Sequence, residues 1–135
     1  MENIKFANKE HKAFYNDMLV TIRNDDSYHK AFFYAMGISA ETRRNIRTLF
    51  DFKDDCIKPE GISCAWQTGS TRRLCRFAFN LWNGWTEEGK EQYSAPYQLF
   101  DCGFAPYFFE AIRLRYPEYC RSLQRPLFLS EGKER

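Results

Sequence analysis

The segment between Leu74 and Gly84 constrains the fold of this chain more than any other. Its apolar residues recur at the spacing i, i+3, i+4, i+7 and i+8, namely Leu74, Phe77, Ala78, Leu81 and Trp82. This spacing places them all on one face of an α-helix. Gly84 follows two positions after the last of them, as glycine often does where a helix ends. The segment therefore predicts a helix with one buried face, but it specifies no reaction.

Aromatic residues supply an unusually large part of the apolar composition. Phe, Trp and Tyr make up 18% of the 135 residues, and each ring brings a large area to bury. β-Branched residues are few, which argues against a large sheet. We therefore expect an all-α protein, a compact single-domain bundle of about five to six helices with a core of rings. This domain is expected to span residues 1–120, followed by a flexible C-terminal tail over residues 121–135.

Capping residues and apolar spacing predict where the individual helices lie. The predicted helices cover residues 8–23, 27–36, 39–50, 70–83, 95–102 and 106–116. Gly37 is expected to follow the second helix as its C′ residue, and Ser94 is expected to cap the fifth. Pro117 cannot continue the last helix, because its ring clashes with the preceding turn.

Residues 51–69 show no sustained period and contain Pro59, Gly61 and Gly69. We interpret them as one long irregular loop, ordered by apolar anchors such as Phe52 and Trp66. Loops of this length are uncommon inside compact domains and often carry function. The segment is therefore a candidate contact region.

Charge and cysteine usage limit the classes of function. The 20 basic and 18 acidic residues leave a net charge of +2, too small to attract nucleic acid with the whole surface or to imitate DNA. The five cysteines are odd in number and form no C-x-x-C pair. No signal peptide or apolar stretch of about 18 residues is present. We expect a cytoplasmic protein with reduced thiols and no membrane contact.

Histidine and cysteine side chains raise two alternative functions, a catalytic cysteine–histidine pair and a zinc site. A cysteine nucleophile would need His11 or His29 as its base, but no local nucleophile signature supports the pair. Zinc could draw on Cys56, Cys64 and the histidines, but these cysteines are eight residues apart rather than closely paired. Packing of both cysteines against aromatic rings is the favoured interpretation. We therefore predict no enzyme, no cofactor and no metal.

Three aspartates, Asp51, Asp54 and Asp55, resemble the start of an acidic metal loop. The central glycine and closing glutamate of a calcium loop are absent. A solvated acidic turn after a helix is therefore the favoured interpretation. Such a turn could still pair with arginines elsewhere in the chain.

Arginine groups are the strongest lead to a binding function. Two groups each contain a pair of arginines one helical turn apart and a third arginine beside the pair. They are Arg43, Arg44 and Arg47, and Arg72, Arg73 and Arg76. Arg113, Arg115, Arg121 and Arg125 continue the pattern. The planar guanidinium fork suits phosphate and carboxylate and stacks on rings. The alternative is that these residues are ordinary solvated helix faces, paired with nearby glutamates.

Three aromatic residues, Trp66, Trp85 and Tyr97, lie in or beside predicted loops. Exposed rings beside arginine are typical of the residues that dominate protein interfaces. The same combination also suits stacking on unpaired bases. Trp66 and Trp85 therefore join the arginines as candidate binding residues.

Several short motifs occur in an order that resembles a small uncharacterised family of bacterial helical proteins. They are Glu10-His11 with Phe14, Ala31-Phe32-Phe33-Tyr34, Asp51-Phe52 with Ile57-Lys58-Pro59-Glu60, the stretch from Trp66-Gln67-Thr68-Gly69-Ser70 to Leu81-Trp82-Asn83-Gly84, and Ala111-Ile112-Arg113-Leu114-Arg115-Tyr116. The resemblance covers about residues 4–116. It implies a single-domain protein of Gram-positive bacteria, their phages or conjugative elements, and it brings no activity or functional residues.

Two hypotheses follow. The first is a non-enzymatic protein-binding module from a mobile element or phage, acting as an inhibitor of a host defence nucleoprotein of the anti-CRISPR type. Its partner would be a protein or ribonucleoprotein effector, with contact to a nucleic-acid backbone where a guide strand is exposed. The alternative is a small nucleic-acid-binding regulator that uses the arginine-rich helix faces.

Overall fold

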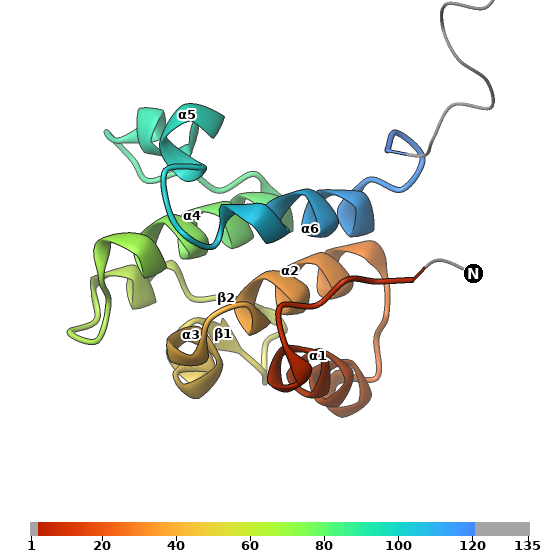
Figure 1. The fold of residues 1–135 in the computed structure, drawn as a ribbon. Coiled ribbons are helices and arrows are strands. Elements are labelled where there is room, and N and C mark those ends of the chain that lie inside the picture. The colour runs from red at the N-terminus through yellow and green to blue at the C-terminus, as the bar shows by residue number, and fades with distance from the viewer. Residues whose placement is uncertain (1–2, 121–135) are drawn as a thin grey trace, which may run out of the picture.

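Helix α2 (Ser27–Gly37) lies at the centre of the fold. The computed structural model describes residues 3–120. Helix α2 contacts α1 (Lys9–Ile22), α4 (Gly69–Asn83) and α6 (Phe108–Arg115). In Figure 1, α4 and α6 lie side by side above α2, and α1 lies below it. The central helix is therefore enclosed by elements from both ends of the chain.

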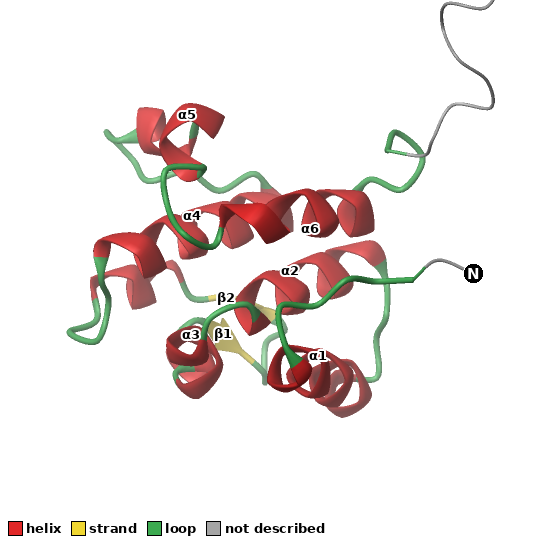
Figure 2. Ribbon diagram, in the orientation of Figure 1, coloured by secondary structure: helices red, strands yellow, loops and turns green. Residues whose placement is uncertain are grey.

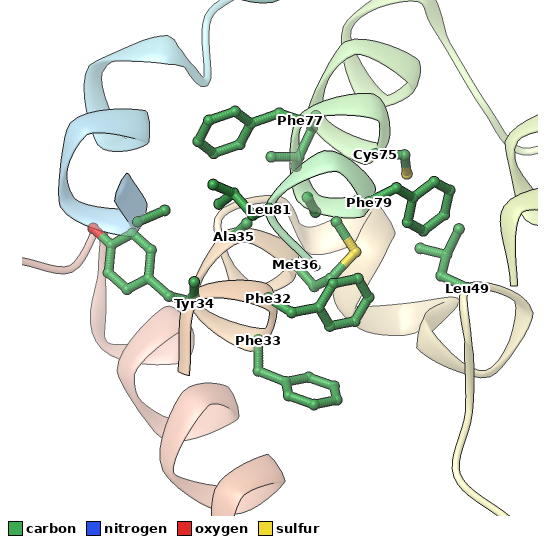
Figure 3. Packing of buried hydrophobic residues seen from close by; sticks show 14 of the residues in the cluster. Phe32, Phe33, Tyr34, Ala35, Met36, Leu49, Cys75, Phe77, Phe79 and Leu81 are labelled. Atoms are coloured by element: carbon green, nitrogen blue, oxygen red, sulfur yellow. The ribbon is translucent and has the colours of Figure 1, made fainter. Parts of the chain in front are cut away.

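The second half of α2 is buried around its whole circumference. Residues 31–37 are all buried, and Phe32, Phe33 and Tyr34 have no exposed surface. In Figure 3, these three side chains leave the helix in different directions, each toward a different part of the interior. A helix that is hydrophobic on all sides is a core helix rather than an amphipathic surface helix.

Aromatic rings form most of the interior, as the composition predicts. Phe50 meets Phe33 edge-on, with ring centroids 5.1 Å apart. Phe77 of α4 stacks on Phe108 of α6, with centroids 3.9 Å apart. Such ring pairs add roughly 0.5–1.5 kcal/mol each beyond the area they bury. The predicted stripe of α4 is confirmed as buried at Leu74, Phe77, Ala78 and Leu81, while Trp82 is partly buried.

Side chains from neighbouring elements satisfy carbonyl groups near the C-terminal end of α2. The Nε2 atom of His11 lies 2.7 Å from the Tyr34 carbonyl oxygen, and Arg43 Nη1 donates to the Gly37 carbonyl at 2.7 Å. The Thr42 hydroxyl donates to the Met36 carbonyl. The last carbonyls of a helix have no partner inside it, and leaving them buried and unpaired is costly. These side chains therefore allow α2 to end in the interior.

Gly37 does not act as the left-handed C′ residue that the sequence predicts. It is the last residue of α2, and Ile38 after it is also right-handed. A Cβ at position 37 would lie 2.6 Å from His11 Cδ2 and 3.0 Å from Phe14 Cδ2. Glycine is required here because α1 approaches the backbone of α2 closely.

The short elements differ from their predicted lengths. Helix α3 covers only Ala40–Arg44 and continues as a 3₁₀ turn, Ile46–Thr48, because the chain then turns into a strand. Helix α5 is confined to Pro96–Leu99, and its N-cap is Ala95 rather than Ser94. Ser94 instead closes a 3₁₀ turn that begins at residue 91. The predictions for α1, α4 and the end of α6 before Pro117 are confirmed within one or two residues.

Residues 51–69 are not the irregular loop that the sequence predicts. Strands β1 (Phe50–Asp51) and β2 (Cys56–Ile57) form a small antiparallel hairpin, and a 3₁₀ helix, η2 (Pro59–Ser63), follows. The Asp51 carboxylate accepts hydrogen bonds from two backbone N–H groups of the turn, at 2.9 Å each. Asp51 thus fixes the turn locally, which is why two such short strands can form.

The hairpin is joined to α2 through His29. The Nδ1 of this buried imidazole lies 2.7 Å from Asp26 Oδ1, and its Nε2 lies 2.8 Å from Asp55 Oδ1. Burial alone lowers the pKa of His29, but hydrogen bonds and charges from Asp55 and Asp26 outweigh it and raise the pKa above its ordinary value. The acidic turn predicted from the sequence therefore contributes to the fold through Asp55.

The described part of the chain is thus largely all-α, with six α-helices and one two-stranded sheet (Figure 2). No helix within it is both long and apolar enough to cross a membrane. The predicted tail, residues 121–135, with Arg121 and Arg125, lies outside the described residues.

We expect Gly37→Ala to lower the free energy of unfolding by about 1–3 kcal/mol, because the added methyl group overpacks the α1–α2 contact. Gly103→Ala is the matched control, since a Cβ there meets nothing within 4 Å. Urea unfolding followed by circular dichroism measures both. Equal stability of the two variants would contradict the close approach at Gly37.

We expect the stability difference between the wild type and His29→Gln to shrink as the pH rises from 6 to 9. A histidine whose pKa is raised on folding contributes most below its unfolded value of 6.5, and this contribution is lost as the pH rises through the folded pKa. Urea unfolding at several pH values measures the difference. His11 is present in both proteins, so its own titration cancels. A difference that stays constant or grows with pH would exclude a charged His29.

Candidate functional site

A hollow of about 270 Å³ lies beside the first half of α4. It is lined by Gly69, Arg72, Arg73, Arg76, Tyr93 and Gln98, and we call it the arginine pocket. Its walls come from α4, from the 3₁₀ turn before α5, and from α5 itself, which contact one another. Figure 1 shows α5 over α4 in this part of the molecule. One of the two predicted arginine groups therefore converges on a single concave site.

The start of α4 is fixed by a capping box. The Thr68 hydroxyl accepts from the Thr71 N–H at 3.1 Å, and the Thr71 hydroxyl accepts from the Thr68 N–H at 2.8 Å. This reciprocal pair satisfies two backbone donors and sets where the helix begins. Because Arg72, Arg73 and Arg76 follow within two turns, the cap also sets the register of the arginines on the pocket wall.

Arg76 is the most firmly held of the three arginines. Its Nε and Nη2 atoms both lie 3.1 Å from Glu87 Oε1. Its guanidinium also lies over the ring of Tyr93, 5.1 Å from the centroid. The side chains of Arg76 and Glu87 are only 14% and 24% exposed, so solvent screens this pair weakly. Arg76 therefore joins α4 to the segment that follows it.

Arg73 connects α4 to α5 mainly through neutral acceptors. Its Nε donates to the Gln98 carbonyl at 3.0 Å, and its Nη1 donates to the Gly69 carbonyl at 3.3 Å. Asp101 lies 4.0 Å from Arg73 Nη2 and is 83% exposed, so it offsets little of the charge. The guanidinium is positioned by the fold and keeps most of its positive charge uncompensated.

Arg72 carries the least compensated charge in the pocket. Its Nε donates to the Ile62 carbonyl of η2 at 3.3 Å. Within residues 3–120, no carboxylate forms an ion pair with it. The three guanidinium groups thus face the Glu87 carboxylate, which also pairs with Lys90 at 3.7 Å, and one weak counter-charge from Asp101. The pocket has a surplus of positive charge and suits an anion.

Exposed aromatic rings lie on or directly after α5, which lines the arginine pocket, and on α6, the next α-helix along the chain. Tyr97, which precedes the pocket residue Gln98 on α5, is 87% exposed, as its position beside a predicted loop suggested. Phe100 is 43% exposed and meets Phe108 of α6 edge-on, and Phe109 of α6 is 62% exposed. Large rings left in solvent beside arginine have the composition of a protein interface. The helical spacing of Phe109 predicts a core position in the last helix, which its exposure shows to be wrong, and Phe100 was not singled out by sequence reasoning.

The other predicted arginines do not line this pocket. Arg43 caps the Gly37 carbonyl, and Arg44 pairs with Glu41 at 2.7 Å on the exposed face of α3. Arg47 lies over the ring of Phe52, 5.3 Å from its centroid. Each of these side chains makes a contact within its own part of the fold. The two arginine groups therefore belong to different elements and do not form one lining.

The two candidate tryptophans also lie outside the pocket lining. Trp66 and Trp85 are partly buried and pack against the hydrophobic core. Trp85 meets Phe79 edge-on at 5.3 Å. Tyr93 and Glu87, which do contact Arg76, were missed because the stretch between α4 and α5 has no apolar period. The only available signal was its acidic and aromatic content close to an arginine-rich helix.

Both histidines are used inside the fold. His11 is completely buried, its Nδ1 accepts from the Ala7 N–H at 3.0 Å, and its Nε2 donates to the Tyr34 carbonyl. Burial lowers the pKa of His11 to about 4, although the hydrogen bond with Tyr34 opposes this. The ring is therefore neutral at pH 7. His29 has both nitrogens engaged by aspartates.

The cysteines do not gather with other ligands. Cys56 is exposed on β2 and Cys64 is partly buried, and both are free thiols. Desolvation and the charges of Asp51 and Asp54 raise the pKa of Cys56. Within residues 3–120, no three His, Cys, Asp or Glu side chains are placed to hold a metal ion.

Comparison with known proteins places the chain in a family. Residues 1–127 match the model of DUF6075, a family of unknown function, and the chain belongs to this family. No curated protein and no solved structure matches the chain significantly.

We expect Arg76→Gln to lower the free energy of unfolding by about 1–2 kcal/mol, because it breaks a partly buried ion pair. Arg44→Gln is the control, and removing this exposed pair with Glu41 should cost less than about 0.5 kcal/mol. Urea unfolding measures the stability of Arg76→Gln and Arg44→Gln. The same measurement on Glu87→Gln and on the Arg76→Gln/Glu87→Gln double variant gives the coupling energy between Arg76 and Glu87. Additive losses in the Arg76–Glu87 cycle would show that this pair contributes nothing to the fold.

Proposed function

We propose that this protein is a non-enzymatic binding module that captures an acidic segment of a protein partner in the arginine pocket. The observation that carries this proposal is the convergence of three guanidinium groups on one hollow with a surplus of positive charge. Arginine forks recognise anionic groups with directed hydrogen bonds. Tyr97, exposed on α5 directly before the pocket residue Gln98, would provide apolar contact at this charged site.

A binding role also agrees with how the chemically versatile side chains are used. Both histidines are buried and have both ring nitrogens engaged, so neither is free to act as a base for a thiol. The thiol of Cys75 is buried, and this burial raises its pKa to about 12. The thiol of exposed Cys56 also has a raised pKa, which disfavours the reactive thiolate.

The alternative, a nucleic-acid-binding regulator, has weaker support. A nucleic-acid backbone is an extended anion and is usually followed by a groove or stripe of basic residues. Here Arg43 and Arg47 are held by contacts within their own region, and they do not extend the lining of the pocket into a basic groove. A single concave site suits one anionic group of a protein better than a continuous strand.

The finer proposal concerns the partner. An inhibitor of a host defence nucleoprotein would insert exposed rings and arginines where that effector presents acidic side chains or a guide backbone. This part of the proposal depends on the resemblance to proteins of mobile elements and phages. In this proposal, the arginine pocket is the contact site whether the partner is a protein or a ribonucleoprotein.

We expect Arg72→Glu to abolish capture of the partner from a host lysate while the melting temperature stays within a few degrees of the wild type. Arg72 has no ion pair within residues 3–120 and one long hydrogen bond to lose, so the fold depends on it little. Arg44→Glu makes the same charge change on α3 and should capture the partner normally. Quantitative mass spectrometry of matched pull-downs measures the recovery.

Two results would contradict this proposal. Equal recovery of all proteins by the wild type and Arg72→Glu would remove the arginine pocket from the interface. Loss of every captured component after nuclease treatment, with nucleic acid bound directly by the purified chain, would favour the regulator instead. In that case the affinity should also fall steeply with added salt, because counterions are released on binding.

A further inference from the structure

We propose that the arginine pocket recognises a phosphate monoester carried by the partner protein, so that the partner binds in its phosphorylated form. This inference rests on the proposed function, since it names the anion that the same site takes. The charge balance of the pocket, its size and the way its arginines are held all support a phosphate monoester.

The charge of the pocket matches a dianion better than a carboxylate. Arg76 is paired with Glu87 at 3.1 Å, which leaves Arg72 unpaired within residues 3–120 and Arg73 with only the distant, exposed Asp101. About two positive charges therefore lack a close counter-charge. A phosphate monoester carries about two negative charges at pH 7.5, whereas a carboxylate or a phosphodiester carries one.

The size of the pocket suits one functional group with its linkage. Its volume of about 270 Å³ lies just below the range of about 300–1,000 Å³ in which whole small molecules are bound. A phosphate with the side chain that carries it needs less room than a nucleotide. The site therefore fits the modified end of an amino-acid side chain.

The arginines are positioned before any ligand binds. Arg72 and Arg73 each use Nε to donate to a backbone carbonyl, of Ile62 and Gln98 respectively. Anchoring the Nε restricts each long side chain, so less rotamer entropy is lost when the remaining N–H groups bind an anion. Tyr93 also lines the pocket, and its hydroxyl is a further donor that phosphate oxygens could accept from.

Glu87 provides an internal test of this assignment. Its carboxylate pairs with Arg76 at 3.1 Å and with Lys90 at 3.7 Å, so neutralising it by Glu87→Gln makes the net charge at the pocket more positive by one. We expect this variant to bind a phosphate monoester several-fold more tightly. Glu41→Gln is the matched control, because it removes the carboxylate paired with Arg44 on α3 and leaves the pocket unchanged.

The experiment titrates the protein with three small anions at pH 7.5 and follows the arginine Nε–Hε signals by NMR. Phenyl phosphate represents the monoester, benzoate the carboxylate and dimethyl phosphate the nucleic-acid backbone. We expect phenyl phosphate to shift the Arg72 and Arg73 signals with an affinity at least tenfold above the other two. Arg72→Gln should abolish the effect, and Arg44→Gln should leave it unchanged.

The outcomes separate this inference from the proposed function. Benzoate binding as tightly as phenyl phosphate would overturn the phosphate assignment but leave an acidic protein partner in place. Preference for dimethyl phosphate would overturn both in favour of nucleic acid. No shift of the arginine signals with any anion, or shifts that survive Arg72→Gln, would overturn the phosphate site. Phosphatase treatment of the lysate should likewise abolish capture of the partner, and unchanged capture would contradict the inference alone.

Discussion

The burial of the second half of α2 on all sides is the constraint on which the rest of the structure depends. A helix of rings at the centre leaves no solvent to satisfy its last carbonyl groups, so other parts of the chain must supply donors. His11, Thr42 and Arg43 do this, from the helix before α2 and from the helix after it. The positions of α1 and α3 are therefore consequences of enclosing α2, as is the absence of a side chain at Gly37.

The burial of α2 also gives the arginines of different elements different roles. Near the centre, Arg43 is committed to a carbonyl, and Arg47 is stacked on a ring. Leu74 and Phe77 occupy the inner face of α4, which leaves Arg72 and Arg73 on its outer side. There Arg72 donates to a carbonyl of η2 and Arg73 to a carbonyl of α5, and these acceptors orient the guanidinium groups without neutralising them. The uncompensated positive charge therefore lies on arginines of α4 that do not take part in enclosing α2.

Sequence reasoning succeeded where one physical signal dominates. The period of α4, the start of α1 near residue 8 and the Pro117 stop are local features, and the structure confirms them. The hairpin at 50–57 was missed because its strands have only two residues each, and it depends on Asp51 within the turn and on the long-range contact of His29 with Asp55. Likewise, the arginines of α4 could be proposed from their spacing, but Glu87 and Tyr93 meet them only through tertiary folding.

The donors that cap α2 have a consequence for how the protein opens. Because the end of α2 is closed by residues from α1 and α3, no one of these three helices can detach without exposing unpaired groups of another. Their backbone amides should exchange with deuterium together, as a single cooperative unit. The stretch around α5 supplies none of these donors; it is held to α4 by Arg73 and Arg76, and its Leu99 is buried in the core. The arginine pocket, lined by α4, α5 and the 3₁₀ turn between them, therefore lies outside the unit formed by α1, α2 and α3.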